Sequence, residues 1–580
     1  MKYSDIPSAQ TVVLFFKSRG IRNIVISPGS RNAPLTLGLT KNPFFKCYSI
    51  VDERCAAFFA LGMAQQLQEP VAVVCTSGSA LLNYYPAIVE AYYSDIPLIV
   101  VSADRPTYKI DVGDGQTIRQ KGVFSGHIGF EANLKQDVAH ATETIRFFDK
   151  NYTSKTQQEI QQFNEGQISA ALDHAMLNST PVHVNVPFEE PLYGMTNTAK
   201  ITVPVVLESS AKESQLEDWE KYIAIWNKCK RKMVLVGVNP PNTIEKNVID
   251  LLAGSDDILV LTETTSNLHH PNFFPSIDSI IAPIEKSQKG EALFQKLQPD
   301  LLITFGGLIV SKKVKAFLRK YQPKTHWHID PKKAFDTFFC LSEHIKATPN
   351  HFLKSIFSLE DKTTDGGYRL HWNLMKKNYE VECQNYLKQI EFSDFTAYNA
   401  VLKHIPKGYQ VHLANSSTVR YTQLFPMHKS LEVFCNRGTS GIDGSTSTAL
   451  GASIHKKSPT LLITGDLSFF YDSNGLWNNY VKPDFRIILI NNAGGGIFRI
   501  LPGSEETKEF ETFFETPHPY TAAHLAKMYG FDYQKADNLE QLESCLSNFY
   551  ETSKTPKILE IFTPRLKNDK ILLSYFDFIS

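Results

Sequence analysis

Short apolar runs alternate with longer amphipathic stretches along most of the chain. In the first third, each apolar run is rich in branched residues and ends in Gly, Asp, Ser, Thr or Pro. Helical patterns such as Cys55 to Leu67 and Tyr84 to Tyr93 lie between the runs. Near-continuous apolar strands that alternate with helices are typical of a parallel sheet covered on both faces. The runs that we expect to be strands here are 23–27, 47–51, 71–75, 97–102 and 182–186.

The same pattern recurs twice more, after polar, turn-rich segments at 189–204 and 360–367. We interpret these two segments as linkers. The pattern therefore predicts an α/β fold with three doubly wound parallel-sheet domains, over residues 1–190, 205–358 and 368–580. The strands expected in the second and third regions are 233–238, 258–261, 301–305, 327–329, 410–413, 432–434, 461–463, 487–490 and 558–562.

Composition and charge narrow the possible partners. Of the 580 residues, 42% are hydrophobic and 21% are charged, and the formal net charge is zero with no long basic or acidic block. This balance argues against a nucleic acid or a charged membrane surface as partner. No apolar run reaches the roughly 18 residues of a membrane span, and residues 1–5 do not open a signal peptide.

The cysteines point to a reducing compartment. The chain has eight, which are scattered and form no CxxC pair. We therefore expect neither a structural zinc site nor a disulfide framework. A cytoplasmic location is the expectation that follows.

The most informative stretch lies in the third region. One apolar run ends in Gly465-Asp466, and the next ends in Asn491-Asn492-Ala493-Gly494. Two parallel strands joined by a crossover helix would bring Asp466 and Asn492 to the same sheet edge. Carboxylate, amide and backbone carbonyl oxygens suit Mg²⁺, and a helix that begins near Ser468 would direct its N-terminus at phosphates. The stretch therefore predicts a Mg²⁺–diphosphate site; the alternative is an ordinary βαβ turn in which Asp466 caps the helix.

Polar residues also gather where the strands of the first region end. They supply one acid of interest, Glu53, and two guanidinium groups, Arg31 and Arg105. Arginines at such an edge suit bidentate binding of carboxylates. Each segment by itself could also be a loop with a solvated charge. The segments are 27–31, 52–54, 76–79, 104–106 and 114–118.

The second and third regions add further candidates. Segments 415–420 and 436–444 follow strands of the third region, and the glycines of the latter allow close backbone approach to a flat ligand. Segment 494–498 is expected to be a mobile loop over that ligand. In the second region Lys312 and Lys313 begin a predicted helix. No GxGxxG occurs there, so a dinucleotide site is poorly supported, and we interpret His269-His270 as structural or exposed.

Gly465-Asp466 followed by Asn491-Asn492 resembles the metal motif of thiamine-diphosphate enzymes, with Leu467 at a position that is usually glycine. Over essentially its full length the chain further resembles one family among them, the 2-succinyl-5-enolpyruvyl-6-hydroxy-3-cyclohexene-1-carboxylate (SEPHCHC) synthases of menaquinone biosynthesis. The residues that carry this resemblance are Ser27 to Arg31, Asp52 to Arg54, Asp104 to Pro106, Asn436 to Gly444 and Gly465-Asp466.

The resemblance implies a pyrimidine-binding first domain, a middle domain and a diphosphate-binding last domain. It implies a homodimer or homotetramer whose active sites lie at the dimer interface, with thiamine diphosphate and Mg²⁺ (or Mn²⁺) as cofactors. The implied activity is decarboxylation of 2-oxoglutarate and 1,4-addition of the remaining succinyl unit to isochorismate.

The resemblance also assigns roles to single residues. Glu53 would bind the pyrimidine N1′ and is the main catalytic residue, together with Arg31 and Gln116, and Ile442 would support the bend of the cofactor. Asp466, Asn492 and the Gly494 carbonyl would hold the metal. The residues implied to bind substrate are Arg31, Arg105, Gln116, Lys312, Ser416, Arg420 and Arg437. Those implied to contact the cofactor, besides Glu53, Ile442, Asp466 and Asn492, are Ser77, Gly78, Ser416, Ser440, Gly441, Leu467, Ser468, Ile497 and Phe498.

Two other interpretations stay open at this point. Another thiamine-diphosphate decarboxylase or carboligase, such as an acetolactate-synthase type, would share Glu53 and the metal motif. Enzymes of that type usually bind FAD in the middle domain and need fewer arginines at strand ends. A related subunit without activity is the second alternative, against which the presence of Glu53, Asp466 and Asn492 speaks.

Overall fold

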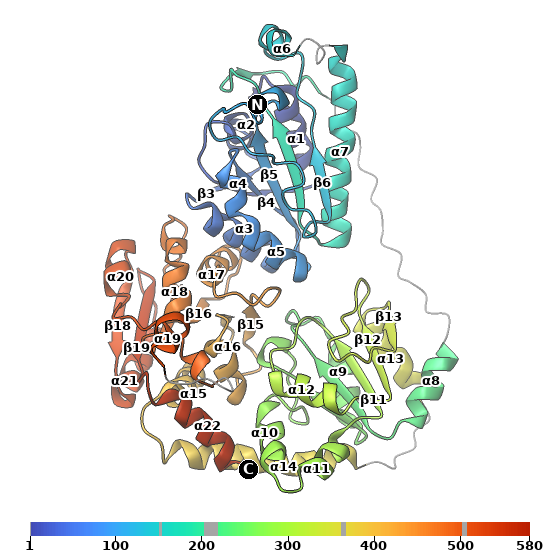
Figure 1. Ribbon diagram of the computed structural model, residues 1–580, viewed down its shortest axis with the longest axis vertical. Helices are drawn as coiled ribbons and strands as arrows, with labels where there is room; N and C mark the ends of the chain where they lie inside the picture. Colours follow the sequence, from blue (N-terminus) through green and yellow to red (C-terminus); the bar gives the residue numbers. More distant parts are fainter. Residues whose placement is uncertain (1, 150–153, 202–218, 361–366, 501–506) are drawn as a thin grey trace. The chain divides into compact units, whose positions relative to one another are not determined.

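The computed structural model describes residues 2–149, 154–201, 219–360, 367–500 and 507–580. It contains three large sheets, and every strand pair within them is parallel. Figure 1 shows each sheet with helices packed around it. The predicted α/β class with three doubly wound parallel sheets is confirmed.

The first sheet has the strand order β3-β2-β4-β5-β7-β6. The order reverses between β2 and β4, so the loops after these two strands flank a topological switch point, where ligands of open α/β sheets usually bind. Its strands are β2 (Asn23–Ile26), β3 (Lys46–Ser49), β4 (Val71–Cys75), β5 (Leu98–Asp104), β6 (Phe130–Asn133) and β7 (Val182–Pro187). Its helices are α1 (Pro7–Ser18), α2 (Ala33–Thr40), α3 (Glu53–Leu67), α4 (Ser79–Asn83), α5 (Tyr85–Tyr93), α6 (Thr142–Phe148) and α7 (Gln157–Asn178).

The second sheet, of order β10-β9-β11-β12-β13, is buried on both faces. Along β9, Met233 and Leu235 belong to one hydrophobic core, and Val234 and Val236 belong to another. This alternation is the period of a strand between two helical layers. The strands are β9 (Lys232–Val236), β10 (Ile258–Leu261), β11 (Leu301–Phe305), β12 (Thr325–Ile329) and β13 (Glu343–Ile345). The helices are α8 (Trp219–Lys228), α9 (Lys246–Gly254), α10 (Asp278–Lys286), α11 (Gly290–Leu297), α12 (Lys312–Lys320) and α13 (Pro349–Leu359).

The third sheet has the order β15-β14-β16-β17-β19-β18, and β16 and β17 lie side by side. Its strands are β14 (Gln410–Leu413), β15 (Glu432–Cys435), β16 (Thr460–Gly465), β17 (Arg486–Asn491), β18 (Asp532–Ala536) and β19 (Lys557–Phe562). The helices of this part of the chain are α14 (Tyr368–Leu387), α15 (Asp394–His404), α16 (Ser417–Tyr421), α17 (Ser445–Ser453), α18 (Asp466–Tyr471), α19 (Lys508–Phe510), α20 (Ala523–Tyr529), α21 (Leu539–Phe549) and α22 (Asn568–Phe578).

Three strands of these sheets were not predicted: β6, β13 and β18. Each lies at the edge of its sheet and carries polar residues, such as Glu131 in β6 and Gln534 in β18. An edge strand buries less of its surface, so its sequence does not show a continuous apolar run. The first predicted linker contains a short strand, β8 (Met195–Thr196), which pairs antiparallel with β1 (Tyr3–Ser4). Residues 202–204 of that linker and 361–366 of the second lie outside the described residues.

By its contacts the chain forms two compact units. The first unit comprises residues 1–211, 438–457 and 470–485, and the second comprises 212–437, 458–469 and 486–580. This division groups the second and third sheets together and gives α17 to the first unit. The domain ranges expected from the sequence therefore stay a prediction, and each unit is described by itself below.

Within the first unit, α17 crosses α3 at very short range. A Cβ atom on Gly62 of α3 would lie 2.0 Å from the backbone oxygen of Thr448, and one on Gly451 of α17 would lie 1.9 Å from that of Phe59. Only glycine fits at both positions, because a backbone oxygen cannot move aside without moving its helix.

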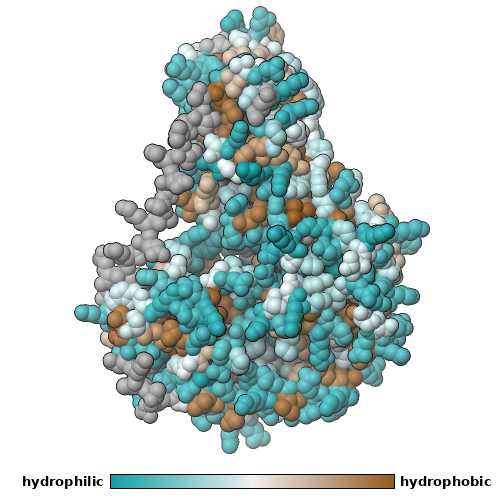
Figure 2. Space-filling view, turned by 180° about the vertical axis from the view of Figure 1, so that it is seen from behind, coloured by the Kyte–Doolittle hydropathy of each residue, from teal (hydrophilic) through white to brown (hydrophobic). Residues whose placement is uncertain are grey.

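Figure 2 shows one face of the molecule coloured by hydropathy. On the face shown in Figure 2, hydrophilic side chains predominate and hydrophobic ones form small, separate patches. Among the described residues, none of the helices combines the length and the apolar character that crossing a bilayer requires.

The helix crossing gives a first prediction. Gly62→Ala and Gly451→Ala should each lower the free energy of unfolding by about 1–3 kcal/mol, because the added methyl group overpacks the contact. Gly166→Ala in α7 is the matched control, since a Cβ there meets no atom within 4 Å. Chemical denaturation followed by circular dichroism measures all three variants. A loss at Gly166 as large as that at Gly62 would contradict the role given to the crossing.

Candidate functional site

In the first unit, two arginines lie together at the carboxyl edge of the first sheet. Arg31 is 6% exposed and donates to the backbone oxygen of Phe188 at 3.1 Å and to Glu190 at 3.0 Å. Arg105 donates to Ser77 and to the backbone oxygen of Gln116. Burial lowers the pKa of Arg105, and the charge of Arg31 lowers it further. The edge thus holds two guanidinium groups near enough to repel each other, an arrangement that an anionic ligand would relieve.

The loops that surround these arginines contain three more predicted residues. Ser77 contacts Arg105, and the Gly78 N–H donates to Gln120 at 2.9 Å. A Cβ on Gly78 would lie 3.0 Å from the backbone oxygen of Gln116, so the two loops touch. The first sheet therefore brings together five of the predicted site residues: Arg31, Ser77, Gly78, Arg105 and Gln116.

Glu53 is the first residue of α3, the helix that follows β3. Asp52 is the N-cap residue of this helix. The carboxylate of Glu53 makes neither a hydrogen bond nor an ion pair within the part of the chain that the structure describes. Glu53 forms no salt bridge with its neighbour Arg54 in the described structure. Arg54 instead donates to the backbone oxygen of Tyr471 at 2.7 Å and lies 3.7 Å from Asp472. Glu53 is therefore available to a ligand.

A buried glutamate that the sequence did not reveal holds the glycine-rich loop before α17. Glu90 of α5 is 1% exposed and accepts hydrogen bonds from the backbone N–H groups of Gly438 and Thr439, both at 2.7 Å. The hydroxyl of Thr439 donates to the same carboxylate at 2.9 Å. This anchor fixes the start of the loop that carries Ser440, Gly441 and Ile442. The Ile442 side chain is 36% exposed, which is unusual for an isoleucine and leaves an apolar surface for a ligand.

In the second unit, the three predicted metal ligands lie together. Asp466 follows β16 and Asn492 follows β17, and the parallel register pairs Gly465 with Ile490. Asp466 is 3% exposed and accepts hydrogen bonds from the N–H of Leu467 at 2.6 Å and of Gly494 at 2.9 Å. A Cβ on Gly465 would meet no atom within 4 Å, so the space beside the strand end is open.

This donor set fits a hard divalent cation. It offers one carboxylate, the amide oxygen of Asn492 and the carbonyl of Gly494, which are the oxygen types that Mg²⁺ and Mn²⁺ prefer. Among the described residues no group of three or more His, Cys, Asp or Glu side chains could hold a metal. That result agrees with this set, which contains only one such side chain. The remaining coordination positions would fall to the phosphate oxygens of the cofactor.

The neighbourhood of Asp466 holds two residues that the sequence did not suggest. His518 Nε2 lies 3.4 Å from an Asp466 oxygen. Asp394, the first residue of α15, accepts a hydrogen bond from the Asn492 side chain at 3.0 Å. Both are distant in sequence from the strand ends that they contact, and neither lies in a recognisable motif.

Lys312, the lysine that the resemblance selects, is an exposed residue at the start of α12. Its neighbour Lys313 pairs with Glu285 and lies 5.7 Å from the ring centroid of Phe576. Lys315, one helical turn further, is half-buried, and the charges of Arg437 and Arg420 act on it. Lys312 and Lys315 are three residues apart, so their side chains lie on the same face of α12.

Arg420 and Arg437, the two predicted arginines of the second unit, also lie near each other. Burial lowers the pKa of Arg420, and Arg437 lowers it further, whereas Asp278 raises it. Arg437 is held by Asn415, whose amide oxygen accepts from its guanidinium at 2.8 Å. Ser416 follows Asn415 with a left-handed backbone (φ 70°). A group of positively charged side chains therefore lies here, made up of Arg420, Arg437 and Lys315. Asn415 and Ser416 lie beside it.

A second buried glutamate holds the start of α12. Glu263 is 2% exposed, and its carboxylate accepts from the N–H groups of Val310 at 2.7 Å and Ser311 at 2.7 Å. Burial raises the pKa of Glu263 to about 7, against the lowering effect of these hydrogen bonds. The adjacent Thr264 donates to the backbone oxygen of Thr422 at 3.2 Å, which ties this support to the segment after Arg420.

The switch point of the second sheet is closed by backbone. The order changes between β9 and β11, where a dinucleotide would usually bind. There the N–H of Gly307 donates to the oxygen of Val238 at 2.7 Å, and a Cβ on Gly237 would lie 1.9 Å from the Gly307 oxygen. No room for a pyrophosphate is left between these strand ends.

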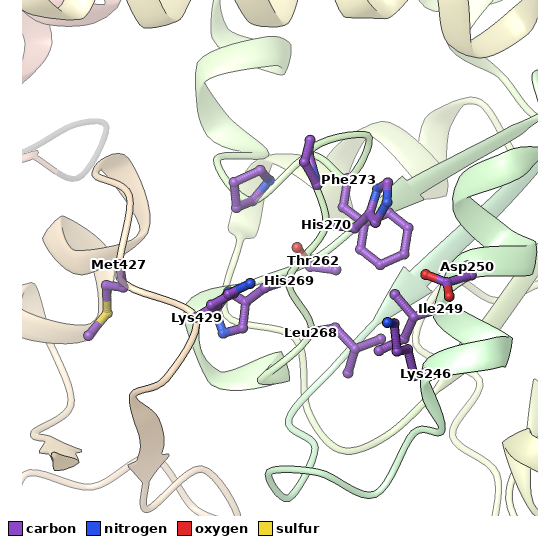
Figure 3. Close-up of a pocket in the computed structure, with 12 residues that line it drawn as sticks. Lys246, Ile249, Asp250, Thr262, Leu268, His269, His270, Phe273, Met427 and Lys429 are labelled. Carbon is purple, nitrogen blue, oxygen red and sulfur yellow. The ribbon is translucent and has the colours of Figure 1, made fainter. Parts of the chain in front are cut away.

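A cavity of about 460 Å³ elsewhere in the second unit contains none of the predicted site residues (Figure 3). His269 and His270 line it, and both are half-buried. His270 accepts from the N–H of Asn272 at 3.0 Å and lies against Phe273, so its contacts are structural, as predicted. The other lining residues include Lys246, Ile249, Asp250, Thr262, Leu268, Pro271, Pro275, Met427 and Lys429.

The remaining predicted cofactor contacts follow the two strand ends of the third sheet. Leu467 and the buried Ser468 lie in the first turn of α18. Ile497 and Phe498 lie in a 3₁₀ turn at Gly496–Ile500, and Phe498 packs near Phe514. Their roles toward a cofactor stay predictions.

Comparison with known proteins agrees with this geometry. Residues 8–128 match the family described as "Thiamine pyrophosphate enzyme, N-terminal TPP binding domain", and residues 415–561 match the corresponding "C-terminal TPP binding domain". The first stretch contains Glu53, Arg31 and Arg105, and the second contains Asp466 and Asn492.

Full-length relatives carry one common name. The chain is 52% identical over 583 aligned residues to a protein of Christiangramia forsetii, with 100% of both chains covered. It is 51% identical to one of Flavobacterium johnsoniae, with 99% of both covered, and 37% identical to one of Porphyromonas gingivalis, with 100% of this chain and 98% of the other covered. All three are named 2-succinyl-5-enolpyruvyl-6-hydroxy-3-cyclohexene-1-carboxylate synthase. With this identity along its whole length, the chain belongs to the SEPHCHC synthase family of thiamine-pyrophosphate enzymes.

Proposed function

We propose that the protein is a carboligase that decarboxylates 2-oxoglutarate and adds the remaining succinyl unit to isochorismate in a 1,4 sense, giving SEPHCHC in menaquinone biosynthesis. The observation that carries this proposal is the identity of 50–52% along the full chain to relatives of that name. Each proposed substrate has two carboxylates, and both units offer clustered cations at strand ends. The scattered cysteines, all free, support a cytoplasmic location.

Thiamine diphosphate, when bound, supplies the carbanion chemistry for carbon–carbon bond cleavage and formation. Asp466, Asn492 and the Gly494 carbonyl would hold its Mg²⁺ (or Mn²⁺), and Ser440, Gly441 and Ile442 would form the surface beneath it. Ser77, Gly78, Ser416, Leu467, Ser468, Ile497 and Phe498 complete the proposed contacts. In this proposal the chain's own residues would fix the position of the diphosphate.

Glu53 has the central catalytic role in this proposal. A carboxyl group beside the pyrimidine N1′ exchanges a proton with that nitrogen and so sets the protonation state of the ring. Its place at the first turn of α3, with no competing partner in the described structure, supports this role. The proposed assembly is a homodimer or homotetramer in which Glu53 of one copy serves the metal site of another.

The substrate carboxylates need fixed positive charges. We assign Arg31, Arg105, Arg420, Arg437 and Lys312 to them, with Gln116 and Ser416 as hydrogen-bonding partners. Arg31 and Gln116 are placed next to the reacting carbon as further catalytic residues. We add Lys315 to these residues because it lies on the same face of α12 as Lys312 and interacts electrostatically with Arg420 and Arg437. Charge-assisted hydrogen bonds of this kind orient both substrates before reaction.

An acetolactate-synthase type of activity is the alternative with least support. Enzymes of that type usually hold FAD in the middle domain, and here the switch point of the second sheet is closed at Gly237 and Gly307. The full-length relatives also carry the other name.

A product assay tests the proposal. Full-length protein incubated with thiamine diphosphate, Mg²⁺, 2-oxoglutarate and isochorismate should give a product whose mass equals the sum of the two substrates minus CO₂. Mass spectrometry measures it, and omission of isochorismate or of Mg²⁺ (with a chelator) should abolish it. A product formed from two molecules of a 2-oxoacid would favour the alternative activity, and no turnover of any 2-oxoacid would indicate an inactive relative.

Replacing Glu53 tests the proton-transfer role. Glu53→Gln should leave the fold intact and lower kcat by about 10²–10⁴-fold, because the amide cannot exchange the required proton. Glu69→Gln, at an exposed position just beyond the same helix, is the control and should keep kcat. Steady-state kinetics together with circular dichroism measure both. Equal kcat values in the two variants would remove Glu53 from the mechanism.

Three of the four lysines of α12, namely Lys312, Lys313 and Lys315, test the proposed substrate site. Lys312→Met and Lys315→Met should each raise KM for a dicarboxylate substrate about 10-fold or more, since a hydrogen bond to a charged group contributes roughly 1.5–3 kcal/mol. Lys313→Met should change KM little, because Lys313 already pairs with Glu285. Methionine keeps most of the side-chain stem, which limits packing losses. If Lys313→Met has the largest effect on KM, the assignment of the helix face is wrong.

A further inference from the structure

Asn492 can reach a metal in only one of two orientations. Its side-chain amide has an acceptor end, Oδ1, and a donor end, Nδ2, which have nearly the same shape. A cation binds the oxygen and is repelled by the NH₂ group. A rotation of the amide by half a turn would therefore remove one metal ligand without changing the volume of the site.

Asp394 removes this ambiguity. Its Oδ2 atom accepts a hydrogen bond from Asn492 Nδ2 at 3.0 Å, across 98 residues of sequence. A carboxylate oxygen cannot donate, so the amide atom that faces it has to be the nitrogen. Asn492 Oδ1 is then directed away from Asp394, and among the described residues it accepts no hydrogen bond. It stays open to a cation.

Asp394 is itself held rigidly. Its other oxygen accepts from the Thr563 hydroxyl at 2.6 Å, and its backbone N–H donates to Asn568 Oδ1 at 2.8 Å. Asn568 donates in turn to the Thr563 hydroxyl at 3.3 Å. All three residues are buried, at 2% exposure for Asp394, 8% for Thr563 and 5% for Asn568. The carboxylate thus has a fixed direction toward Asn492.

The support also joins three elements of the third sheet. Asp394 begins α15, and Thr563 directly follows β19, where its N–H donates to the Asn491 oxygen at 3.1 Å. Asn492 follows β17, the neighbour of β19. One network therefore fixes the strand end, the amide and the carboxylate relative to each other.

We propose that Asp394 is a positioning residue for the divalent cation: it fixes the Asn492 amide with its oxygen toward the metal. This inference rests on the proposed metal site of Asp466, Asn492 and Gly494. Outer partners that orient metal ligands typically change metal affinity about 10–100-fold when they are removed. Asp394 does not touch the metal or the substrate in this proposal.

Metal binding by the full-length protein tests the inference directly. Protein freed of metal is titrated with Mn²⁺ in the presence of thiamine diphosphate, and free Mn²⁺ is counted by its electron paramagnetic resonance signal. Asp394→Ala should weaken Mn²⁺ binding about 10–100-fold. Asp394→Asn has the same shape but allows either orientation of the facing amide, so it should weaken binding by about threefold or more.

Asp577→Asn is the control, because Asp577 is an acid of the same unit that pairs with Lys286 at the surface, and binding should not change. A thermal melt of each variant separates loss of fold from loss of metal. In turnover assays, Asp394→Asn should need more Mg²⁺ but reach the parental kcat at saturation, which a general loss of stability would not produce.

The outcomes separate the inference from the proposal on which it rests. If the parent protein binds no Mn²⁺ with thiamine diphosphate, the proposed metal site itself is wrong. If the parent binds Mn²⁺ and Asp394→Asn binds it within twofold, the positioning role is overturned, even where Asp394→Ala fails to fold.

Discussion

The pairing of β16 with β17 is the constraint on which the proposed metal site depends. The two strands are parallel neighbours, so both chains leave the sheet at the same edge and in the same direction. Asp466 and Asn492 are the residues at which they leave. The backbone register thus places both residues at the same edge of the sheet. A change of strand order would separate the carboxylate from the amide even with every residue kept.

A second recurring feature of the structure is a buried carboxylate that accepts hydrogen bonds from a loop of the candidate site. Glu90 binds two N–H groups of the loop before Ile442, Glu263 binds two at the start of α12, and Asp394 binds the side chain of Asn492. Burying a carboxylate is costly unless its oxygens are hydrogen-bonded. In each case the loop supplies those donors, so the carboxylate and the loop stabilise each other. In the proposed function, the loops contact the ligands, whereas the buried carboxylates that hold these loops do not.

The sequence predicted every central strand of the three large sheets, and the three strands that it missed all lie at a sheet edge. Strand β11 was predicted at its observed bounds, because a central strand is buried on both faces and its sequence is a nearly continuous apolar run. Strand β18 was missed, since only one of its five residues is buried. The positions of Asp466, Asn492, Arg31 and Arg105 at or just beyond strand ends could be predicted, because each lies shortly after an apolar run. Lys315 and the three supporting carboxylates could not, because their contacts depend on tertiary packing.

The middle sheet has no open ligand position at its switch point, but it supports a helix of the candidate substrate site. Its switch point is filled by the backbones of Gly237 and Gly307, so the usual ligand position is closed. Its α12 helix, however, begins directly after Val310 and Ser311, whose N–H groups donate to Glu263. The adjacent Thr264 donates to the backbone oxygen of Thr422, in the segment after Arg420. The sheet therefore contributes through the helix that it positions and not through its strand ends. In the proposed function, the positive charges for a dicarboxylate would come from Lys312 and Lys315 of this helix and not from the strand ends of the sheet.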